Sequence, residues 1–356
     1  MTDKHTSHQM TKTAPPSASE NAASGNAAAS LNAAANTVAA MTAAMTADGA
    51  GAAIPADKFR IIGIDEKGGE ILARKRVGYW ADAWRRFRQN KIALVAATIL
   101  CVLIFFIIFG PAISGYNYEE IDQAAINQLP SAKHWFGTDK LGRDLFARVW
   151  QAGRVSIIIG LVAAVVSSVI GSIYGGIAAY FGGTVDDVMM RIVEILLSIP
   201  YLLIVILISV FTDSKSLGTM LVALTLTGWC GIARIVRGQM LQLKQQEFVL
   251  AANALGVSPF KIIIKHMIPN TIGLIIVAIT FDIPGYIFSE AFLSYVGLGI
   301  QSPQTSWGAL ASAAQESFMF YPYQLFFPAL MIALTMLSFT LMGDGLRDAL
   351  DPKQRK

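Results

Sequence analysis

Two carboxylates lie inside a long apolar stretch in the C-terminal third of the sequence. Asp282 and Glu290 stand on either side of Pro284 within residues 272–298, where most side chains are apolar. An ionisable group is costly inside a membrane, so it usually faces protein or water and marks a pathway or a polar contact. For Asp282, a position on a translocation path and a structural role in a hydrogen-bonded pair or helix break are both open. For Glu290, nearer one end of the stretch, we favour a structural role.

The other residues that carry chemistry do not form the patterns that enzymes use. The four histidines, His5, His8, His134 and His266, are scattered and show no metal-ligand spacing with the cysteines. The sequence contains no Gly-Lys dipeptide, so the phosphate-binding loop with its lysine is missing. It also lacks the nucleophile elbow of serine hydrolases. We therefore expect no catalytic residues, no metal and no cofactor, and we expect a partner to bind ATP.

The composition indicates a membrane protein. Of 356 residues, 54% are hydrophobic and 15% are charged, whereas an ordinary soluble domain has about 45–50% apolar and about 25% charged residues. Segments of roughly 20 mostly apolar residues can cross a bilayer core about 30 Å thick, and in lipid they must be helices. Six segments fit: 92–113, 155–180, 192–211, 217–236, 272–298 and 325–342. The sequence thus predicts an all-α protein with six transmembrane helices, the third kinked at Pro200.

The distribution of basic residues predicts the orientation of these spans. From Lys58 onward, 20 of the 26 Lys and Arg residues lie on the side of the two termini, and six lie on the other side. Cytoplasmic segments carry an excess of Lys and Arg, so both termini are expected in the cytoplasm and the protein in the inner (plasma) membrane. In the segment between the first two spans, which this orientation places outside, Asp139, Arg143, Asp144 and Arg148 are expected to form a salt-bridged fold rather than a substrate site.

Two segments precede the first span. Residues 1–57 are mainly Ala, Gly, Ser, Asn and Thr, a composition that predicts a disordered cytoplasmic tail, although a cleaved signal peptide is an alternative. Residues 58–91 carry ten Lys and Arg residues, and Trp80, Trp84 and Phe87 recur among them at helical spacing. This pattern predicts an amphipathic helix on the membrane surface with guanidinium groups near lipid phosphates. Nucleic-acid binding is the alternative, and we do not expect it.

Between the fourth and fifth spans, residues 247–270 are too polar to cross the membrane but strongly patterned. Glu247 opens a short run with helix-forming Ala251 and Ala252, Gly256 can end that helix in a left-handed cap, and Ser258-Pro259 can begin another. Small side chains permit close approach to a partner. The segment is therefore predicted to be a short helical peg that docks in a partner's cleft, and Pro269 fixes its connection to the next span.

At these residues the sequence resembles the EAA loop of ABC importer permeases, which reads Glu-Ala-Ala, three residues, Gly, nine residues, Ile, any residue, Leu, Pro. Ala251, Ala252, Gly256 and Pro269 have the matching spacing, and Ile268 replaces the Leu. In that family the loop docks on the ATPase subunits. The resemblance implies that Ala252 faces the ATPase cleft closely.

Two positions depart from the family's pattern. Leu250 stands where the loop has Glu, and His266 stands where it has Ile. Glu247, three residues before Leu250, is nearly one helical turn away and can supply a carboxylate from a neighbouring face. Whether Leu250 alters ATPase docking is open.

Further blocks resemble the dipeptide, oligopeptide and nickel subfamily of these permeases, and most closely the C-type permease subunit of oligopeptide importers. The resemblance extends from about Tyr79 to the C-terminus and does not include the first fifty-odd residues. The blocks are 134–144 (HWFGTDKLGRD), 153–156, 182–186, 190–200, 290–299, 306–308 and 343–352 (GDGLRDALDP).

The resemblance implies the type I ABC importer permease fold and a set of partners: a second, homologous permease subunit, two ATPase subunits, and an external peptide-binding protein. The implied layout is a tail (1–57), a basic amphipathic segment (58–91), a permease domain (92–345) with an external loop (114–154) and a cytoplasmic coupling segment (243–270), and a C-terminal tail (346–356). An importer of dipeptides, nickel or another small solute, a secondary transporter or channel, and a structural membrane scaffold are the alternatives.

Overall fold

The structure is a computed structural model that describes residues 36, 78–212, 216–301 and 304–351. The expected tail at 1–57 therefore lies outside the described residues except for Asn36. The first part of the basic segment (58–77) and the end of the C-terminal tail (352–356) also lie outside them.

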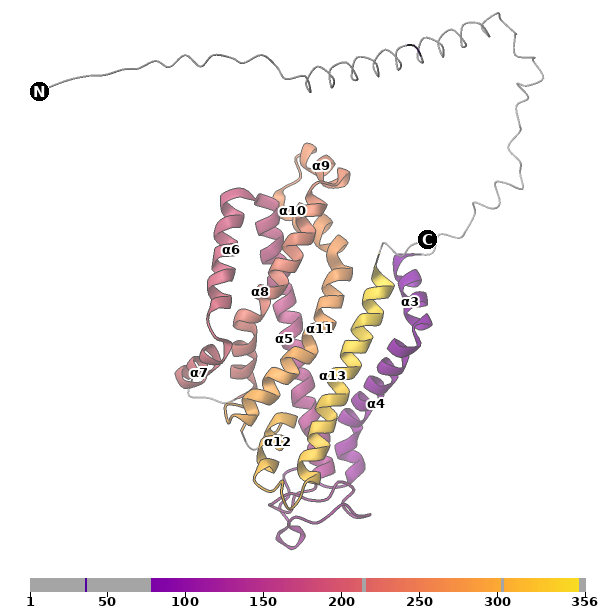
Figure 1. Ribbon diagram of the computed structural model, residues 1–356, viewed down its shortest axis with the longest axis vertical. Helices are drawn as coiled ribbons and strands as arrows, with labels where there is room; N and C mark the ends of the chain where they lie inside the picture. The colour runs from indigo at the N-terminus through magenta and orange to yellow at the C-terminus, as the bar shows by residue number, and fades with distance from the viewer. Residues whose placement is uncertain (1–35, 37–77, 213–215, 302–303, 352–356) are drawn as a thin grey trace, which may run out of the picture. The chain divides into compact units, whose positions relative to one another are not determined.

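The described part of the chain is helical, which confirms the predicted all-α class. The long helices run side by side (Figure 1), and one isolated bridge joins Thr138 to Asp144. The helices are α3 (Tyr79–Gln89), α4 (Lys91–Ser114), α5 (Leu145–Phe181), α6 (Gly183–Ser198), α7 (Tyr201–Thr212), α8 (Leu217–Lys244), α9 (Glu247–Ala254), α10 (Pro259–Ile262), α11 (Ile268–Tyr295), α12 (Trp307–Gln315) and α13 (Tyr323–Leu350), with a 3-10 turn η2 (Gln123–Ala125) and a π turn η3 (Ile263–Met267).

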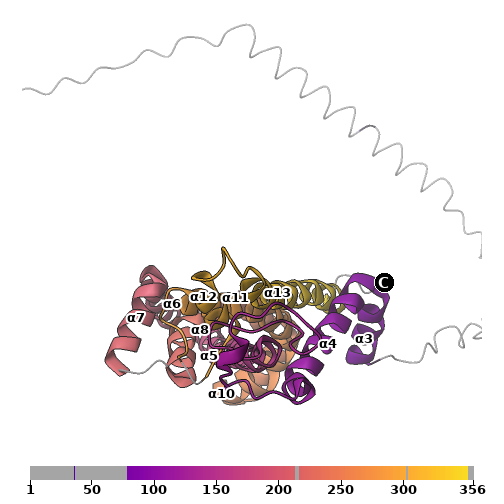
Figure 2. The ribbon, with the colours of Figure 1, turned by 90° about the horizontal axis from the view of Figure 1, so that it is seen from below.

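The two ends of the bundle carry different elements. One end carries α9, α10 and the turn between α5 and α6, and the C-terminal end of α13 with α3 points the same way (Figure 1). The other end carries α12 and the connection between α4 and α5. Seen along the bundle, α7 lies at one edge and α3 with α4 at the opposite edge (Figure 2).

Within the described residues, five helices are long and apolar enough to cross a membrane, and there are six spans if one bent pair counts as a single span. That pair is α6 and α7, which meet at an angle of 81°. Ile199, before Pro200, is extended with φ −79° and ψ 126°, because a residue before proline disfavours the helical region. The kink predicted at Pro200 is confirmed, but it breaks the expected third span into two helices.

The second span also differs from the prediction, because α5 begins at Leu145 rather than at Val155. The Asp144 side chain accepts a hydrogen bond from the backbone N–H of Ala147 at 2.7 Å and so caps the helix. The first turns of α5 are held by buried side chains such as Phe146 and Trp150. Arg148, Gln151 and Arg154 interrupt the apolar residues of these first turns, so hydropathy alone does not locate this helix start.

Small residues bring α5 and α8 together in the middle of the bundle. A Cβ on Gly171 would lie 2.6 Å from the carbonyl oxygen of Trp229, and a Cβ on Gly175 would collide with the backbone of Ala233. Gly171 and Gly175 are four residues apart and share one helix face, the small-xxx-small pattern that lets membrane helices pack closely. This contact places α8, and with it the chain that enters α9, directly against α5.

Candidate functional site

The segment predicted to be a helical peg is a short helix that ends in a left-handed glycine. Gly256 has φ +72°. The N–H of Val257 donates to the Ala252 carbonyl at 3.1 Å, and the N–H of Gly256 donates to the Asn253 carbonyl at 3.0 Å. These two bonds form a Schellman motif, which satisfies the last carbonyls of α9. The helix, its glycine cap and the second helix start at Pro259 are confirmed. We call α9 and α10 with their connection, residues 247–262, the coupling hairpin.

The inner face of the coupling hairpin packs against the rest of the chain. Val249 is fully buried and Ala252 is 8% exposed, in a core cluster with Met240, Ile263 and Met267. The expectation that Ala252 faces a partner is therefore wrong, because its methyl group fills the space between α9 and the bundle. Its small size serves close packing within this chain.

The outer face of the coupling hairpin is apolar and exposed. Leu250 is 54% exposed and Leu255 is 82% exposed, and Phe248 and Phe260 are also exposed. Glu247 lies in the first turn of α9 and is exposed as well; three residues apart, Glu247 and Leu250 are neighbours on the helix surface. Exposed leucines and phenylalanines gathered at one end of a bundle are typical of a protein interface.

The hairpin is joined to the membrane helix α11 by a π turn. Ile268 donates its N–H to the carbonyl of Ile263, five residues earlier. Pro269 follows at once, and it lacks the N–H that would continue the α-helical pattern. Helix α10, the π turn and α11 still form one run of helix, Pro259–Tyr295, so a displacement of the hairpin is carried directly into a membrane helix.

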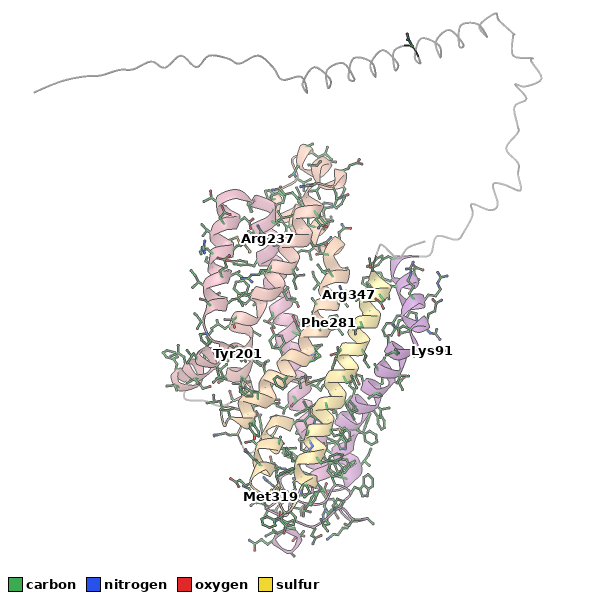
Figure 3. All side chains as sticks on the ribbon, in the orientation of Figure 1. Lys91, Tyr201, Arg237, Phe281, Met319 and Arg347 are labelled. Atoms are coloured by element: carbon green, nitrogen blue, oxygen red, sulfur yellow. The ribbon has the colours of Figure 1, made fainter. Side chains whose placement is uncertain are left out.

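Two polar contacts that the sequence did not reveal hold this end together. The hydroxyl of Tyr180 in α5 donates to Asn253 Oδ1 in α9 at 2.6 Å. Arg237 in α8 donates through Nε and Nη2 to both carboxylate oxygens of Asp186 in α6, a bidentate ion pair. Asp186 is buried, and Arg237 lies near the end of the bundle that carries the hairpin (Figure 3). The pairing partners are 51 residues apart, so spacing could not indicate them.

Of the two intramembrane carboxylates, Glu290 is fully buried and hydrogen-bonded on both oxygens. Ser156 Oγ of α5 donates to Oε2 at 2.9 Å, and Ser294 Oγ of α11 donates to Oε1 at 2.7 Å. Ser156 Oγ also accepts the backbone N–H of Trp307 at 3.2 Å, at the start of α12. The carboxylate thus connects α5, α11 and α12.

We predict that Glu290→Ala destabilises the protein and that Glu290→Gln does not. Alanine leaves the Ser156 and Ser294 hydroxyls without their acceptor, at a cost of about 1–3 kcal/mol each, and adds a cavity. Glutamine keeps an acceptor oxygen and nearly the same volume. Thermal unfolding of the purified full chain measures the difference, and an alanine variant as stable as the original chain would contradict a structural role.

Asp282 lies two turns before Glu290 on α11 and is only partly buried. Among the described residues, its carboxylate has no hydrogen-bond or ion-pair partner, whereas one turn later the hydroxyl of Tyr286 donates to Ser167 Oγ at 2.8 Å. A partly exposed carboxylate without a partner is available to a ligand or to water.

At the opposite end of the bundle, the predicted salt bridges are confirmed for Asp139, Arg143 and Arg148, whereas Asp144 pairs with neither arginine. Arg143 Nε lies 2.8 Å and Arg148 Nε 3.5 Å from Asp139 Oδ2. His134 Nδ1, which the sequence did not assign to the cluster, lies 2.9 Å from Asp144 Oδ2. These contacts fold the connection between α4 and α5 onto the start of α5.

An exposed ion pair also joins that connection to the segment after α12. Lys140 Nζ donates to Glu316 Oε2 at 2.7 Å. This hydrogen bond and the ammonium charge hold the pKa of Glu316 below its usual range. Because both groups are exposed, the pair adds little to stability.

Two family models match the chain. Residues 156–356 match the model described as binding-protein-dependent transport system inner membrane component. Residues 78–130 match the model described as the N-terminal TM domain of oligopeptide transport permease C.

Similar proteins cover most of the chain. The oligopeptide transport system permease protein OppC of Bacillus subtilis is 47% identical over 303 residues, which cover 85% of this chain and 99% of that protein. The dipeptide transport system permease protein DppC of the same organism is 46% identical over 288 residues, 81% of this chain and 90% of that protein. A solved structure of the MetNI methionine ABC transporter in an inward-facing conformation aligns with a TM-score of 0.46 and 20% identity, over 58% of this chain and 96% of that chain.

Proposed function

Since the chain belongs to the family of binding-protein-dependent transport system inner membrane components, we propose that it forms one half of the translocation pore of an ATP-driven importer of oligopeptides. It is a multi-pass inner-membrane permease with the helical fold of that family. The observation that carries the proposal is the coupling hairpin, whose inner face is fixed to the bundle and whose outer face is apolar and exposed.

The hairpin end faces the cytoplasm in this proposal. The described basic residues are concentrated at that end and on α3, and cytoplasmic segments of membrane proteins carry such an excess. Counting α6 and α7 as one broken span gives six spans, and this even number supports a location of both termini on that side. The basic residues of this side are Arg85, Arg86, Arg88, Lys91, Arg191, Arg234, Arg237, Lys244, Lys261, Lys265 and Arg347.

Two ATPase subunits supply the energy, and one of them docks on this chain's hairpin. Leu250, Leu255 and Phe260 enter its cleft, and Ala251, exposed between them, allows close approach. Burial of a leucine contributes about 1.5–3 kcal/mol, so a few such residues are sufficient for stable docking. The family's Glu is replaced by Leu250, and Glu247 provides the carboxylate at the edge of the surface.

Closure of the ATPases then moves the helices that are connected to the hairpin. The hairpin continues through Pro269 into α11, and the Asp186–Arg237 ion pair joins α6 to α8, the helix that enters the hairpin. Rigid connections of this kind convert docking movements into rocking of the spans, so that a central cavity opens to each side in turn.

The remaining partners follow from the family. A homologous permease subunit completes the pore as a heterodimer, and an external substrate-binding protein delivers the peptide to the end that carries α12. Relatives named for oligopeptide and for dipeptide transport are nearly equally similar, at 47% and 46% identity, so a dipeptide importer is the second candidate. We assign no nucleic-acid partner.

Reconstitution tests the function directly. The full chain, its sister permease, the two ATPases and the binding protein are placed in proteoliposomes and supplied with labelled peptides of two to six residues. Uptake is expected to require ATP and to persist when the proton gradient is dissipated. Uptake that survives ATPase removal and stops with the gradient would contradict the proposal and indicate a secondary transporter.

Asp282→Asn tests whether this carboxylate lies on the path. Because Asp282 is partly exposed and has no partner among the described residues, removing its charge leaves no buried group unsatisfied. We expect peptide uptake to fall by about tenfold, roughly 1.4 kcal/mol, while the amount of assembled complex stays unchanged. A parallel fall in abundance would show that the carboxylate is structural.

A further inference from the structure

The corner formed by α3, α4 and α13 contains an apolar groove that is open to the outside of the bundle. The groove has a volume of about 260 Å³, and its walls are aliphatic. Three of the lining residues, Ile92, Val95 and Leu337, are more than half exposed. The groove is lined by Ile92, Val95 and Ile99 of α4 and by Leu334, Leu337 and Leu341 of α13, with Lys91 at its α3 end.

A polar cavity lies next to this groove, between α3 and the C-terminal part of α13. It has a volume of about 380 Å³ and is lined by Arg85, Arg86 and Asn90 on one side and by Gly345 and Asp348 of α13 on the other. The positions that α13 contributes to the groove and to the cavity lie three, four or seven residues apart, so they share one face of the helix. The apolar groove and the polar cavity therefore lie next to each other along the same face of α13.

Helix α3 has the chemistry of a membrane interface. Phe87 is buried in a cluster with Ala93 of α4 and Ala349 of α13, which fixes α3 to the bundle. Trp80 and Trp84, one turn apart, are both more than half exposed. Tryptophans in such positions lie at the level of lipid headgroups.

The charges at this corner are predominantly positive. Between Tyr79 and Lys91, four basic residues stand against the single acid Asp82. Asp82 pairs with Arg85 at 3.1 Å and with Arg86 at 3.0 Å. Arg88 and Lys91 are exposed, and Lys91 projects outward at the junction of α3 and α4 (Figure 3). Asp348 is the acid that faces the polar cavity, so the corner keeps an excess of positive charge.

We propose that this corner binds an anionic phospholipid, with an acyl chain in the groove between α4 and α13 and the headgroup phosphate between Arg85 and Lys91. An aliphatic groove with Lys91 at its end, next to a polar cavity that contains Arg85 and Arg86, fits both parts of such a lipid. The lipid belongs to the leaflet on the hairpin side. The site lies apart from the coupling hairpin and is independent of the transported substrate.

The test measures lipid binding to the purified full chain. The chain in mild detergent is mixed with equal amounts of dioleoyl phosphatidylglycerol and dioleoyl phosphatidylcholine, and native mass spectrometry counts the bound lipids. We expect one retained phosphatidylglycerol in preference to phosphatidylcholine. Each basic residue near lipid contributes about 1 kcal/mol, or about fivefold, so Arg85→Gln with Lys91→Gln should lower that preference by about 25-fold.

Controls separate this site from general charge effects. Lys133→Gln with Arg191→Gln removes the same charge elsewhere and should leave the preference intact; an equal loss in both pairs would overturn the proposal. Leu337→Trp fills the groove and should expel the lipid, whereas Ile108→Trp, exposed on α4 outside the groove, should not. Retention of the lipid in Leu337→Trp, or its displacement by inorganic phosphate, would also overturn the proposal.

Discussion

Leu255→Asp is expected to release the ATPase subunits from the membrane while the permease chain remains inserted and folded. Leu255 is 82% exposed at the tip of the coupling hairpin, so an aspartate there disturbs nothing within this chain. In the complex, the change removes about 1.5–3 kcal/mol of apolar burial and adds a carboxylate to a desolvated surface. We expect ATPase affinity to fall at least about 100-fold, which corresponds to about 3 kcal/mol.

Met319→Asp provides the matched control for this experiment. Met319 is 84% exposed and lies at the end of the bundle opposite the hairpin (Figure 3), so in both variants aspartate replaces an apolar side chain of nearly equal exposure. Co-purification of the ATPases with each variant is the measurement. Loss of the ATPases from both variants, or from neither, would contradict the assignment of the hairpin as the docking surface.

Asp186→Ala is expected to reduce stability and uptake without releasing the ATPases. Removing one partner of a buried ion pair costs about 3–5 kcal/mol. Because the side chain of Arg237 is 31% exposed, water compensates in part and we expect about 2–4 kcal/mol. The outer face of the hairpin is unchanged, so docking persists. The ion pair between α6 and α8 is lost, so α6 no longer moves together with the hairpin. We expect peptide uptake to fall for this reason.

The double variant Asp186→Arg with Arg237→Asp tests this connection, because it restores the pair with the charges exchanged. It should recover at least part of the stability and of the uptake that each single change removes. Thermal unfolding of the purified chain is expected to shift by about 5–10 °C in Asp186→Ala. Unchanged unfolding and uptake in Asp186→Ala would show that the ion pair has no role in coupling.

The sequence was sufficient for features that depend on local chemistry. Gly256 between two helix-forming runs predicted the left-handed cap, since glycine adopts a positive φ at no steric cost. Pro200 predicted a kink, because proline lacks the N–H that the helix needs. Long apolar runs located the membrane helices, and the structure extends several of these at polar ends, where hydropathy gives no signal.

Features that depend on the approach of distant segments could not be predicted. Ala251 and Ala252 look alike in sequence, yet Ala251 is exposed and Ala252 packs against the bundle, because the rotation of α9 is set by its tertiary contacts. Arg237, the partner of Asp186, and Ser156, one of the two partners of Glu290, come from other helices, and residue spacing in a single sequence does not indicate such pairs. The direction of α7 after the 81° bend depends on packing as well as on Pro200, because Val205 of α7 lies in a core cluster with Met220 and Ala223 of α8.

Site-specific photo-crosslinking tests the central claim most directly. A benzophenone amino acid is introduced at Leu255 in one variant and at Met319 in another, and the assembled transporter is irradiated in its membrane. We expect Leu255 to crosslink to an ATPase subunit and Met319 to crosslink to the external binding protein when peptide is present. ATPase crosslinks from Met319, or none from Leu255 in an assembled and active transporter, would contradict the claim that the coupling hairpin transmits ATP-driven movement to the pore.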